Sequence, residues 1–291
     1  MYTIRQASLR SGVSVPLIRA WERRYGVPQP GRSSGGYRLY DDEAIATLRA
    51  MRQLVDDGWQ PSAAAAAIRD GTVPVADAAP HLPDADGTAL AERFVDAAAR
   101  YDGRGLESAL DEMTGRGSFE VVVDTLLLPA AVALGQRWQL GQLDVAAEHA
   151  ASAAIMRRLS AAFEAAGLAS QAPPVIVGMP PGARHELGAL AFATALRRRG
   201  VGVVYLGPDV PIGSWVHAVA AAGAAGAVIG AVREEDAAAA AQVLEAVHAA
   251  APQVRLAVGG KEAGGVATNV PLIVLPASVV AAAETMERAV R

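Results

Sequence analysis

Hydrophobic and polar positions change their period twice along the chain, and each change marks a different kind of structure. In residues 1–70, short amphipathic runs are separated by clusters of Gly, Pro and Ser. These runs predict a strand-like segment at Tyr37–Tyr40 and helices that begin at or near Ile4, Val15, Asp41 and Pro61. Two helices joined by a glycine-containing turn and followed by a short hairpin are typical of a winged helix-turn-helix.

The rest of the chain divides into a helical part and a part where strands alternate with helices. Residues 71–88 hold three prolines and several acidic residues without a sustained period, so they predict a linker. Residues 89–169 keep a helical period and predict a bundle of about four helices. Over residues 173–291, apolar strands, the first at Pro174–Gly178, alternate with helices, one of them capped by Ser214. The fold class is therefore expected to be multidomain, α and α/β, with a Rossmann-like, doubly wound parallel sheet.

Composition supports folded domains in a reducing compartment. The chain has 291 residues, of which 52% are hydrophobic and 19% charged, which is enough apolar surface for several cores. Cysteine is absent, which excludes disulfides, thiolate metal sites and a cysteine nucleophile. The N-terminus carries charge where a signal peptide needs an apolar run, and no stretch predicts a membrane span. We therefore expect a cytoplasmic protein that does not enter a membrane.

Positive charge is concentrated at the N-terminus, although the whole chain has a formal net charge of −4. Residues 1–40 hold seven arginines and a single acidic residue, Glu22. A basic segment on an acidic protein predicts a module that binds a polyanion. Within Val15–Tyr25, three arginines are interleaved with aromatic residues, as expected of a recognition helix in the major groove of DNA.

The N-terminal segment resembles the MerR family of transcription regulators. The matching residues are Tyr2–Ile4, Ser11–Val13, Leu17–Gly26 and Gly36–Tyr40. The resemblance implies a homodimer, or a higher homo-oligomer, that binds a pseudo-palindromic operator in double-stranded DNA. Leu17 and Trp21 are expected to be core residues. The residues expected to contact phosphates or bases are Arg19, Arg23, Arg24, Tyr37 and Arg38.

The loop after the first strand of the C-terminal part has the sequence MPPGARHELG. Open α/β sheets bind ligands at the carboxyl edge of their strands, and an imidazole such as that of His185 can bind a transition metal. The spacing resembles that of cobalamin-binding Rossmann-like domains, which carry Asp-x-His-x-x-Gly, then Ser-x-Leu, then Gly-Gly. Here 41 residues separate Gly188 from Gly230-Ala231-Val232, and a further 26 precede Gly259-Gly260.

The resemblance implies that His185 ligates the cobalt of a cobalamin from below. The positions that it implies around the cobalamin and its nucleotide tail are Gly188, Gly230, Gly259 and Gly260. This chain departs from the family at two polar positions. Ala183 stands where the family has the aspartate that orients the histidine, and Gly230 stands where it has a serine. A glycine there is expected to leave the slot for the tail open.

The helical part carries a second motif, Trp138 followed after nine residues by Glu148-His149. It resembles the upper-face motif of the CarH/LitR-like light-sensing repressors, in which a helical bundle covers the cobalamin and the tryptophan packs on the adenosyl group. A planar ring can recognise a nucleoside by stacking, without charge. The resemblance implies adenosylcobalamin as the cofactor. Those repressors have a histidine directly after the tryptophan, whereas this chain has Gln139, whose amide is a poor ligand for cobalt.

The leading hypothesis is a ligand-responsive DNA-binding repressor whose bundle and Rossmann-like domain sense a corrinoid, with adenosylcobalamin and light as the specific case. The alternative keeps the DNA-binding role but replaces cobalamin with another tetrapyrrole or oligopyrrole, or with a protein partner. A third hypothesis, a corrinoid methyl carrier that serves a methyltransferase, conflicts with the basic head, which a carrier does not need. No nucleophile–base pair or carboxylate cluster predicts catalysis, so we do not expect an enzyme.

Overall fold

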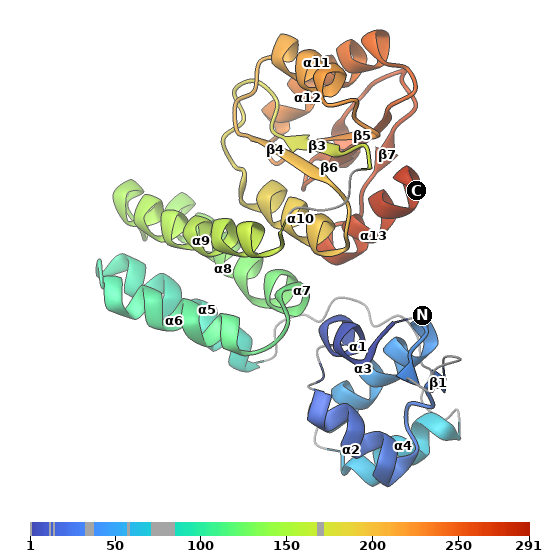
Figure 1. Cartoon of the computed structure of the whole chain (residues 1–291). Coiled ribbons are helices and arrows are strands. Elements are labelled where there is room, and N and C mark those ends of the chain that lie inside the picture. Colours follow the sequence, from blue (N-terminus) through green and yellow to red (C-terminus); the bar gives the residue numbers. More distant parts are fainter. Residues whose placement is uncertain are drawn as a thin grey trace. The chain divides into compact units, whose positions relative to one another are not determined.

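The computed structural model describes residues 2–11, 13, 15–32, 38–56, 59–70, 85–167 and 172–291. These residues form two units, each of which is described by itself (Figure 1). The first unit is the N-terminal head together with residues 116–121, and the second contains the helical bundle and the parallel sheet.

The head consists of short helices and a two-stranded antiparallel wing. Its elements are α1 (Ile4–Ser11), α2 (Val15–Tyr25), β1 (Gly31–Arg32), β2 (Arg38–Leu39), α3 (Asp42–Asp56) and α4 (Pro61–Arg69). The predicted strand at Tyr37–Tyr40 is confirmed at its centre, while Tyr37 lies outside the described residues. Gly26 follows α2 with a φ of 67°, a left-handed conformation that glycine adopts without steric cost. Helix α3 begins next to Asp41, as predicted, and the Asp41 carboxylate caps it by accepting a 2.8 Å hydrogen bond from the Ala44 backbone N–H.

The apolar face of α2 packs into the core of the head. Trp21 is 2% exposed, and Ile18 is fully buried with Leu48 and Met51 of α3. Leu17 packs partly buried at the margin of this core. Leu17 and Trp21 are therefore packing residues, as predicted. The opposite, polar face of α2 is the one that stays in solvent.

The bundle is built from four helical arms within the described residues, as predicted. They are α5 (Ala85–Ala99), α6 (Gly103–Gly115), a continuous arm of α7 (Phe119–Val122), π-helix η1 (Val123–Leu127) and α8 (Leu128–Gln139), and α9 (Val145–Ala165). Helix α5 begins inside the segment 71–88 that the sequence predicts as a linker. Leu90, Phe94 and Val95 bury one face of α5 in the bundle, and this packing extends the helix into residues of low apolar content.

The arm Phe119–Gln139 has a length and a composition that would also suit a membrane span, although the sequence analysis predicts none. It is the one such helical stretch in the part of the chain that the structure describes. Val123, Leu126 and Leu134 of this arm are buried in the protein. Core helices commonly have this composition, so the arm is weak evidence for a span.

The C-terminal domain is a parallel sheet with the strand order β4-β3-β5-β6-β7, which confirms the predicted doubly wound topology. The strands are β3 (Val175–Gly178), β4 (Val203–Gly207), β5 (Gly226–Gly230), β6 (Arg255–Gly259) and β7 (Ile273–Val274). The helices are α10 (Leu187–Arg198), α11 (Ile212–Ala221), α12 (Glu234–Ala250) and α13 (Val279–Val290), with the short η2 (Ala263–Gly265) after β6. Figure 1 shows α11 and α12 over one face of the sheet and α10 and α13 over the other.

The start of α11 differs from the prediction. Its N-cap is Pro211, and Ser214 lies within the first turn instead of capping the helix. Pro211 has φ −60° and ψ 145°, so the restricted φ of proline sets an extended residue directly before the helix. The predicted cap at Ser214 is therefore wrong, because the helix begins two residues earlier, at Ile212.

Side chains of α9, α10 and the π-helix η1 join the bundle to the sheet domain. Arg197 of α10 lies 3.5 Å from the centre of the Phe163 ring of α9 and donates a 3.2 Å hydrogen bond to the Phe163 carbonyl. On the other side, Asp124 of the π-helix binds the N-terminus of α13. Its carboxylate accepts hydrogen bonds from the Ser278 hydroxyl at 2.7 Å and from the Val279 N–H at 2.8 Å. A π-helical turn thus places a carboxylate at the positive end of a helix in the neighbouring domain.

We expect Asp124→Ala to lower the free energy of unfolding of the full chain by about 1–2 kcal/mol, because α13 loses a charged cap. Urea denaturation followed by circular dichroism measures the change. Asp124→Asn is the matched variant: it keeps an acceptor oxygen and should lose less. An Asp124→Ala protein as stable as the native chain would show that this cap contributes nothing.

Candidate functional site

The predicted DNA-contacting arginines of α2 lie on the surface of the head. Arg19, Arg23 and Arg24 are all exposed on α2, and Arg19 and Arg23 lie on the side of the helix away from Trp21. Their side chains carry three positive charges within six residues, a density suited to the phosphates that line a groove of duplex DNA. The geometry of α2 therefore supports its prediction as a recognition helix.

The wing arginine Arg38 has a role inside the head as well. Its Nε lies 2.9 Å from an oxygen of Glu22, and the Tyr40 hydroxyl donates a hydrogen bond to the other oxygen of that carboxylate. Burial, and then the bond to Glu22, raises the pKa of the Tyr40 phenol above its usual value. Glu22 belongs to α2, so this arrangement ties the wing strand β2 to α2. The Arg38 side chain remains 49% exposed, which leaves it accessible to a phosphate.

The second candidate site lies at the carboxyl edge of the sheet. Strand order reverses at β3, which has β4 on one side and β5 on the other, and this is where open α/β sheets bind ligands. His185 follows β3 in the loop that leads to α10, and its side chain is exposed. Within the part of the chain that the structure describes, its imidazole has no hydrogen-bond partner. Ala183, where the family has an aspartate, is buried and offers no acceptor.

Two side chains that the sequence analysis missed hold the loop around His185. The Asp209 carboxylate, from the connection between β4 and α11, accepts a 2.7 Å hydrogen bond from the Gly182 N–H. The Tyr205 hydroxyl, from β4, donates a 2.7 Å hydrogen bond to the Glu186 carboxylate. Burial, and then this bond, raises the pKa of Tyr205. Their place within β4 and directly after it was the available signal, because β4 ends at the same edge of the sheet as β3.

The glycines predicted to surround the ligand differ in their environments. A Cβ at Gly188 would meet no atom within 4 Å, so the start of α10 is open beside His185. Gly260 has a φ of 108°, and a Cβ there would lie 2.2 Å from the Ala231 carbonyl oxygen, so only glycine fits. A Cβ at Gly259 would meet only ordinary packing contacts.

Gly230 does not face an open slot in the structure. A Cβ there would lie 2.3 Å from the sulfur of Met179, which is fully buried. The expectation that glycine leaves the slot open is therefore wrong for this conformation, because the Met179 thioether fills the space. Methionine is flexible and has three rotatable side-chain bonds, so it is a side chain that a ligand can displace at moderate cost.

The cap motif lies at one end of the bundle. Trp138 is 46% exposed near the end of α8, so it is not a core residue, and Gln139 beside it is also exposed. In the first turns of α9, the Glu148 carboxylate lies 2.7 Å from Nδ1 of His149 and also accepts a hydrogen bond from Ser152. This contact orients the imidazole and leaves its Nε2 directed elsewhere.

The packing of α9 on α10 places the cap motif on the side of the His185 loop. The two helices run side by side in the same direction, with Arg197 bound to Phe163 near their C-terminal ends (Figure 1). The contact between Phe163 and Arg197 gives both helices a common reference point. At a rise of 1.5 Å per residue, Glu148 lies roughly 22 Å before Phe163 along α9, whereas the first residue of α10 lies roughly 15 Å before Arg197. The first turns of α9 therefore extend past the start of α10, toward the loop that carries His185.

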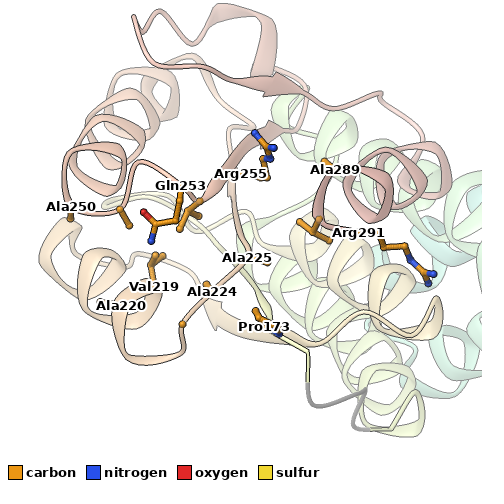
Figure 2. A pocket seen from close by; sticks show the side chains of 14 residues that line it. Pro173, Val219, Ala220, Ala224, Ala225, Ala250, Gln253, Arg255, Ala289 and Arg291 are labelled. Carbon is orange, nitrogen blue, oxygen red and sulfur yellow. The ribbon is translucent and has the colours of Figure 1, made fainter.

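A cavity of about 680 Å³ lies elsewhere, at the amino edge of the sheet (Figure 2). Pro173, Ala225 and Arg255, which precede or begin strands β3, β5 and β6, are among its lining residues. It is on the opposite edge from His185 and contains none of the predicted site residues. Since ligands of open α/β sheets bind at the carboxyl edge, we do not assign this cavity to the candidate site.

The side chains around His185 suit a metal ion whose other ligands come from a bound macrocycle. The described residues contain no group of three or more His, Asp or Glu side chains that could hold a free ion. A lone, exposed imidazole with an open glycine beside it can instead supply one axial ligand to a metal held by a macrocycle. His185 and Gly188 thus fit a corrinoid, while Met179 must move for a long lower substituent.

Two parts of the chain match known families. Residues 2–70 match the MerR HTH family regulatory proteins, and residues 90–162 match the B12 binding domain. The second match falls on the helical bundle, which carries the cap motif, and not on the sheet.

Individual relatives extend these matches over most of the chain. The chain is 36% identical over 220 residues to the HTH-type transcriptional repressor CarH of Myxococcus xanthus, covering 72% of each protein. It is 35% identical over 210 residues to the HTH-type transcriptional repressor CarA of the same organism, covering 72% of this chain and 68% of that one. The monomethylamine corrinoid protein of Methanosarcina barkeri has a similar fold, with a TM-score of 0.52 and 14% identity. That likeness covers 69% of this chain and 99% of the other.

Proposed function

The chain belongs to the family of HTH-type transcriptional repressors that includes CarH and CarA, and we propose that it represses transcription under the control of a bound corrinoid. It is a transcription regulator with a MerR-type head and a B12-binding domain. The specific ligand that we propose is adenosylcobalamin. Its bound form would supply a light-sensitive cobalt–carbon bond, so that light controls the regulator.

The observation that carries this proposal is the exposed imidazole of His185 at the switch point of the sheet, which has no hydrogen-bond partner among the described residues and lies beside open space at Gly188. An imidazole without a hydrogen bond is free to present a lone pair to an axial metal position. In the proposed complex, His185 would supply a nitrogen ligand to the metal, and the exposed ring of Trp138 would stack on the adenosyl group. Glu148 and His149 would approach the bound corrinoid from the side of the bundle.

The head is proposed to act as part of a homodimer or higher oligomer on a pseudo-palindromic operator in the cytoplasm. The proposed contacts come from Arg19, Arg23, Arg24, Tyr37 and Arg38, and the exposed face of α2 supports the first three. We propose that the protein is a regulator without catalytic activity, like the repressors to which it is similar.

A second candidate, another tetrapyrrole bound by the same regulator, is favoured by one structural feature. Met179 packs against Gly230, in the place where the nucleotide tail of cobalamin would enter. A tetrapyrrole without such a tail would leave Met179 undisturbed. Ala183 lacks the carboxylate of the family and Gln139 stands in place of its histidine, and both departures agree with this alternative as well.

Absorption spectra and metal analysis of the purified chain, before and after addition of adenosylcobalamin, separate the two candidates. We expect the cobalt and the corrinoid spectrum to remain with the protein through gel filtration, at about one equivalent per chain. A visible chromophore without cobalt, together with failure to retain adenosylcobalamin, would replace the first candidate with the second.

We expect residue 139 to supply no ligand to cobalt after illumination of the adenosylcobalamin complex, because a carboxamide oxygen is a weak donor. Glu148 orients His149 through Nδ1, so Nε2 of His149 is the imidazole nitrogen of the cap motif that could take this place. A bis-imidazole absorption spectrum of the native chain should then be lost in His149→Ala. Gln139→His should give that spectrum with or without His149. If the native spectrum after illumination is bis-imidazole and survives His149→Ala, the assignment fails.

A further inference from the structure

The His185 loop lacks the carboxylate that would orient its imidazole, yet a different carboxylate reaches the same loop. Ala183, two residues before His185, has no polar side chain, and the ring of His185 makes no hydrogen bond within the described residues. Asp209 comes from the adjacent strand connection, 24 residues further along the chain, and its side chain binds the loop at Gly182. The orientation of His185 therefore depends on how its backbone is held.

Three hydrogen bonds fasten this backbone to the residues after β4. The Gly182 N–H donates to the Asp209 carboxylate at 2.7 Å, and the Asp209 N–H donates to the Ala183 carbonyl at 2.9 Å. The Val210 N–H donates to the Met179 carbonyl at 3.2 Å. Asp209 thus makes bonds to two consecutive residues, one through its side chain and one through its backbone. A single residue closes the turn that directly precedes the candidate ligand.

The backbone of Asp209 supports a specific role for this residue. Its φ is 53°, a left-handed conformation that few non-glycine residues adopt, although Asp and Asn tolerate it better than most. Gly182, its partner, is also left-handed, with a φ of 82°. Such a conformation persists in a folded protein only where surrounding contacts determine it. Here it turns the N–H and the carboxylate of Asp209 toward the same loop.

We propose that Asp209 is the positioning residue of His185, replacing through the backbone the orienting carboxylate that is missing at position 183. This inference rests on the proposed function for its link to cobalt, but the order that it predicts for the loop exists without any ligand. The turn over residues 179–183, which Asp209 closes, directs the imidazole. Metal coordination by His185 consequently depends on the hydrogen bonds of Asp209 to Gly182 and Ala183. It would depend on them less if a carboxylate were hydrogen-bonded to the imidazole ring itself.

Two substitutions separate the carboxylate from the backbone conformation. Asp209→Gly removes the acceptor but suits a φ of 53°, so the backbone is not strained. Asp209→Asn tolerates the same φ and keeps an oxygen that can accept from Gly182. If Asp209 positions His185, the glycine variant should lose the order of the loop and of the His185 ring, and the asparagine variant should keep both.

The first readout uses the protein without ligand. Hydrogen exchange at the Gly182 amide should be roughly tenfold or more faster in Asp209→Gly, because a bond to a charged acceptor is lost, and close to native in Asp209→Asn. Ring relaxation of His185, measured by NMR with labelled histidine, should show greater mobility in the glycine variant alone. His185 ring mobility that is unchanged in Asp209→Gly would overturn the proposal, whatever the ligand.

The second readout uses cob(II)alamin and reports the axial ligand. With ¹⁵N-histidine in the protein, a coordinating His185 splits the electron paramagnetic resonance lines into doublets. The doublet should weaken in Asp209→Gly, with roughly tenfold lower affinity for cob(II)alamin, and recover in Asp209→Asn. A full doublet and native affinity in Asp209→Gly would also overturn the positioning role. Failure of the native chain to bind cob(II)alamin would instead count against the proposed function, while the ligand-free measurements still decide the role of Asp209.

Discussion

Alanine at Arg19, Arg23 and Arg24 together should weaken DNA binding roughly five-hundredfold near 0.1 M salt. Each phosphate contact contributes about 0.9 to the slope of log affinity against log salt, so three contacts change affinity by about 2.7 decades over a tenfold range of salt. The slope itself should fall by about three. All three side chains are exposed on α2, and Trp21 continues to hold the helix in the core.

Fluorescence anisotropy with a duplex selected by the native chain from a random library measures affinity and slope. A matched control carries the same change of charge elsewhere, at three exposed arginines outside the head: Arg100→Ala, Arg104→Ala and Arg255→Ala. The control should bind nearly as the native chain does. Equal salt slopes for the α2 variant and the native chain would refute the assignment of α2 as the recognition helix.

His185→Ala should abolish the protein-derived nitrogen on cobalt and reduce corrinoid affinity by roughly a hundredfold or more. The size follows from metal sites in general, where loss of an outer-sphere partner alone costs about 10–100-fold. The doublet of cob(II)alamin in ¹⁵N-histidine-labelled protein is the direct measurement. In the native chain it distinguishes a protein imidazole from the benzimidazole of the cobalamin, which contains ¹⁴N and gives a triplet.

His217→Ala is the matched control, because it removes another exposed imidazole of the same domain, on α11. Its spectrum and affinity should equal those of the native chain. A doublet that persists in His185→Ala would mean that a different histidine binds cobalt. His149→Ala would then test the imidazole that Glu148 orients.

Much of the fold could be predicted from the sequence because its signals are local. The period of α2 places Trp21 inside and the arginines outside, and Asp41 caps the helix that follows it. Alternating strands and helices after residue 173 predict a parallel sheet, since consecutive parallel strands need a helix to return the chain. The same topology puts His185 at the carboxyl edge, where spacing already marked it as a candidate ligand.

Local signals predict the wrong helix start where packing or a backbone restriction competes with them. Polar residues at the start of α5 predict a linker, but the buried face of that helix extends it back to Ala85. Ser214 has the chemistry of a cap, but the backbone of Pro211 starts α11 earlier. In both places a contact or a backbone restriction outweighs a preference of one residue.

The sequence by itself determined which residues can carry function: the arginines of α2, the cap motif at Trp138 and His149, and the imidazole of His185 in the loop after β3. Only the tertiary structure decided what holds them. Asp209 binds Gly182 across 27 residues, and Asp124 caps a helix 154 residues away at Ser278. Such pairs leave no period and no spacing in a sequence, because their partners meet only after the strands are ordered and the helices are packed. A lone aspartate at either position has the same local chemistry as one in solvent, and the fold alone supplies the backbone N–H that it binds.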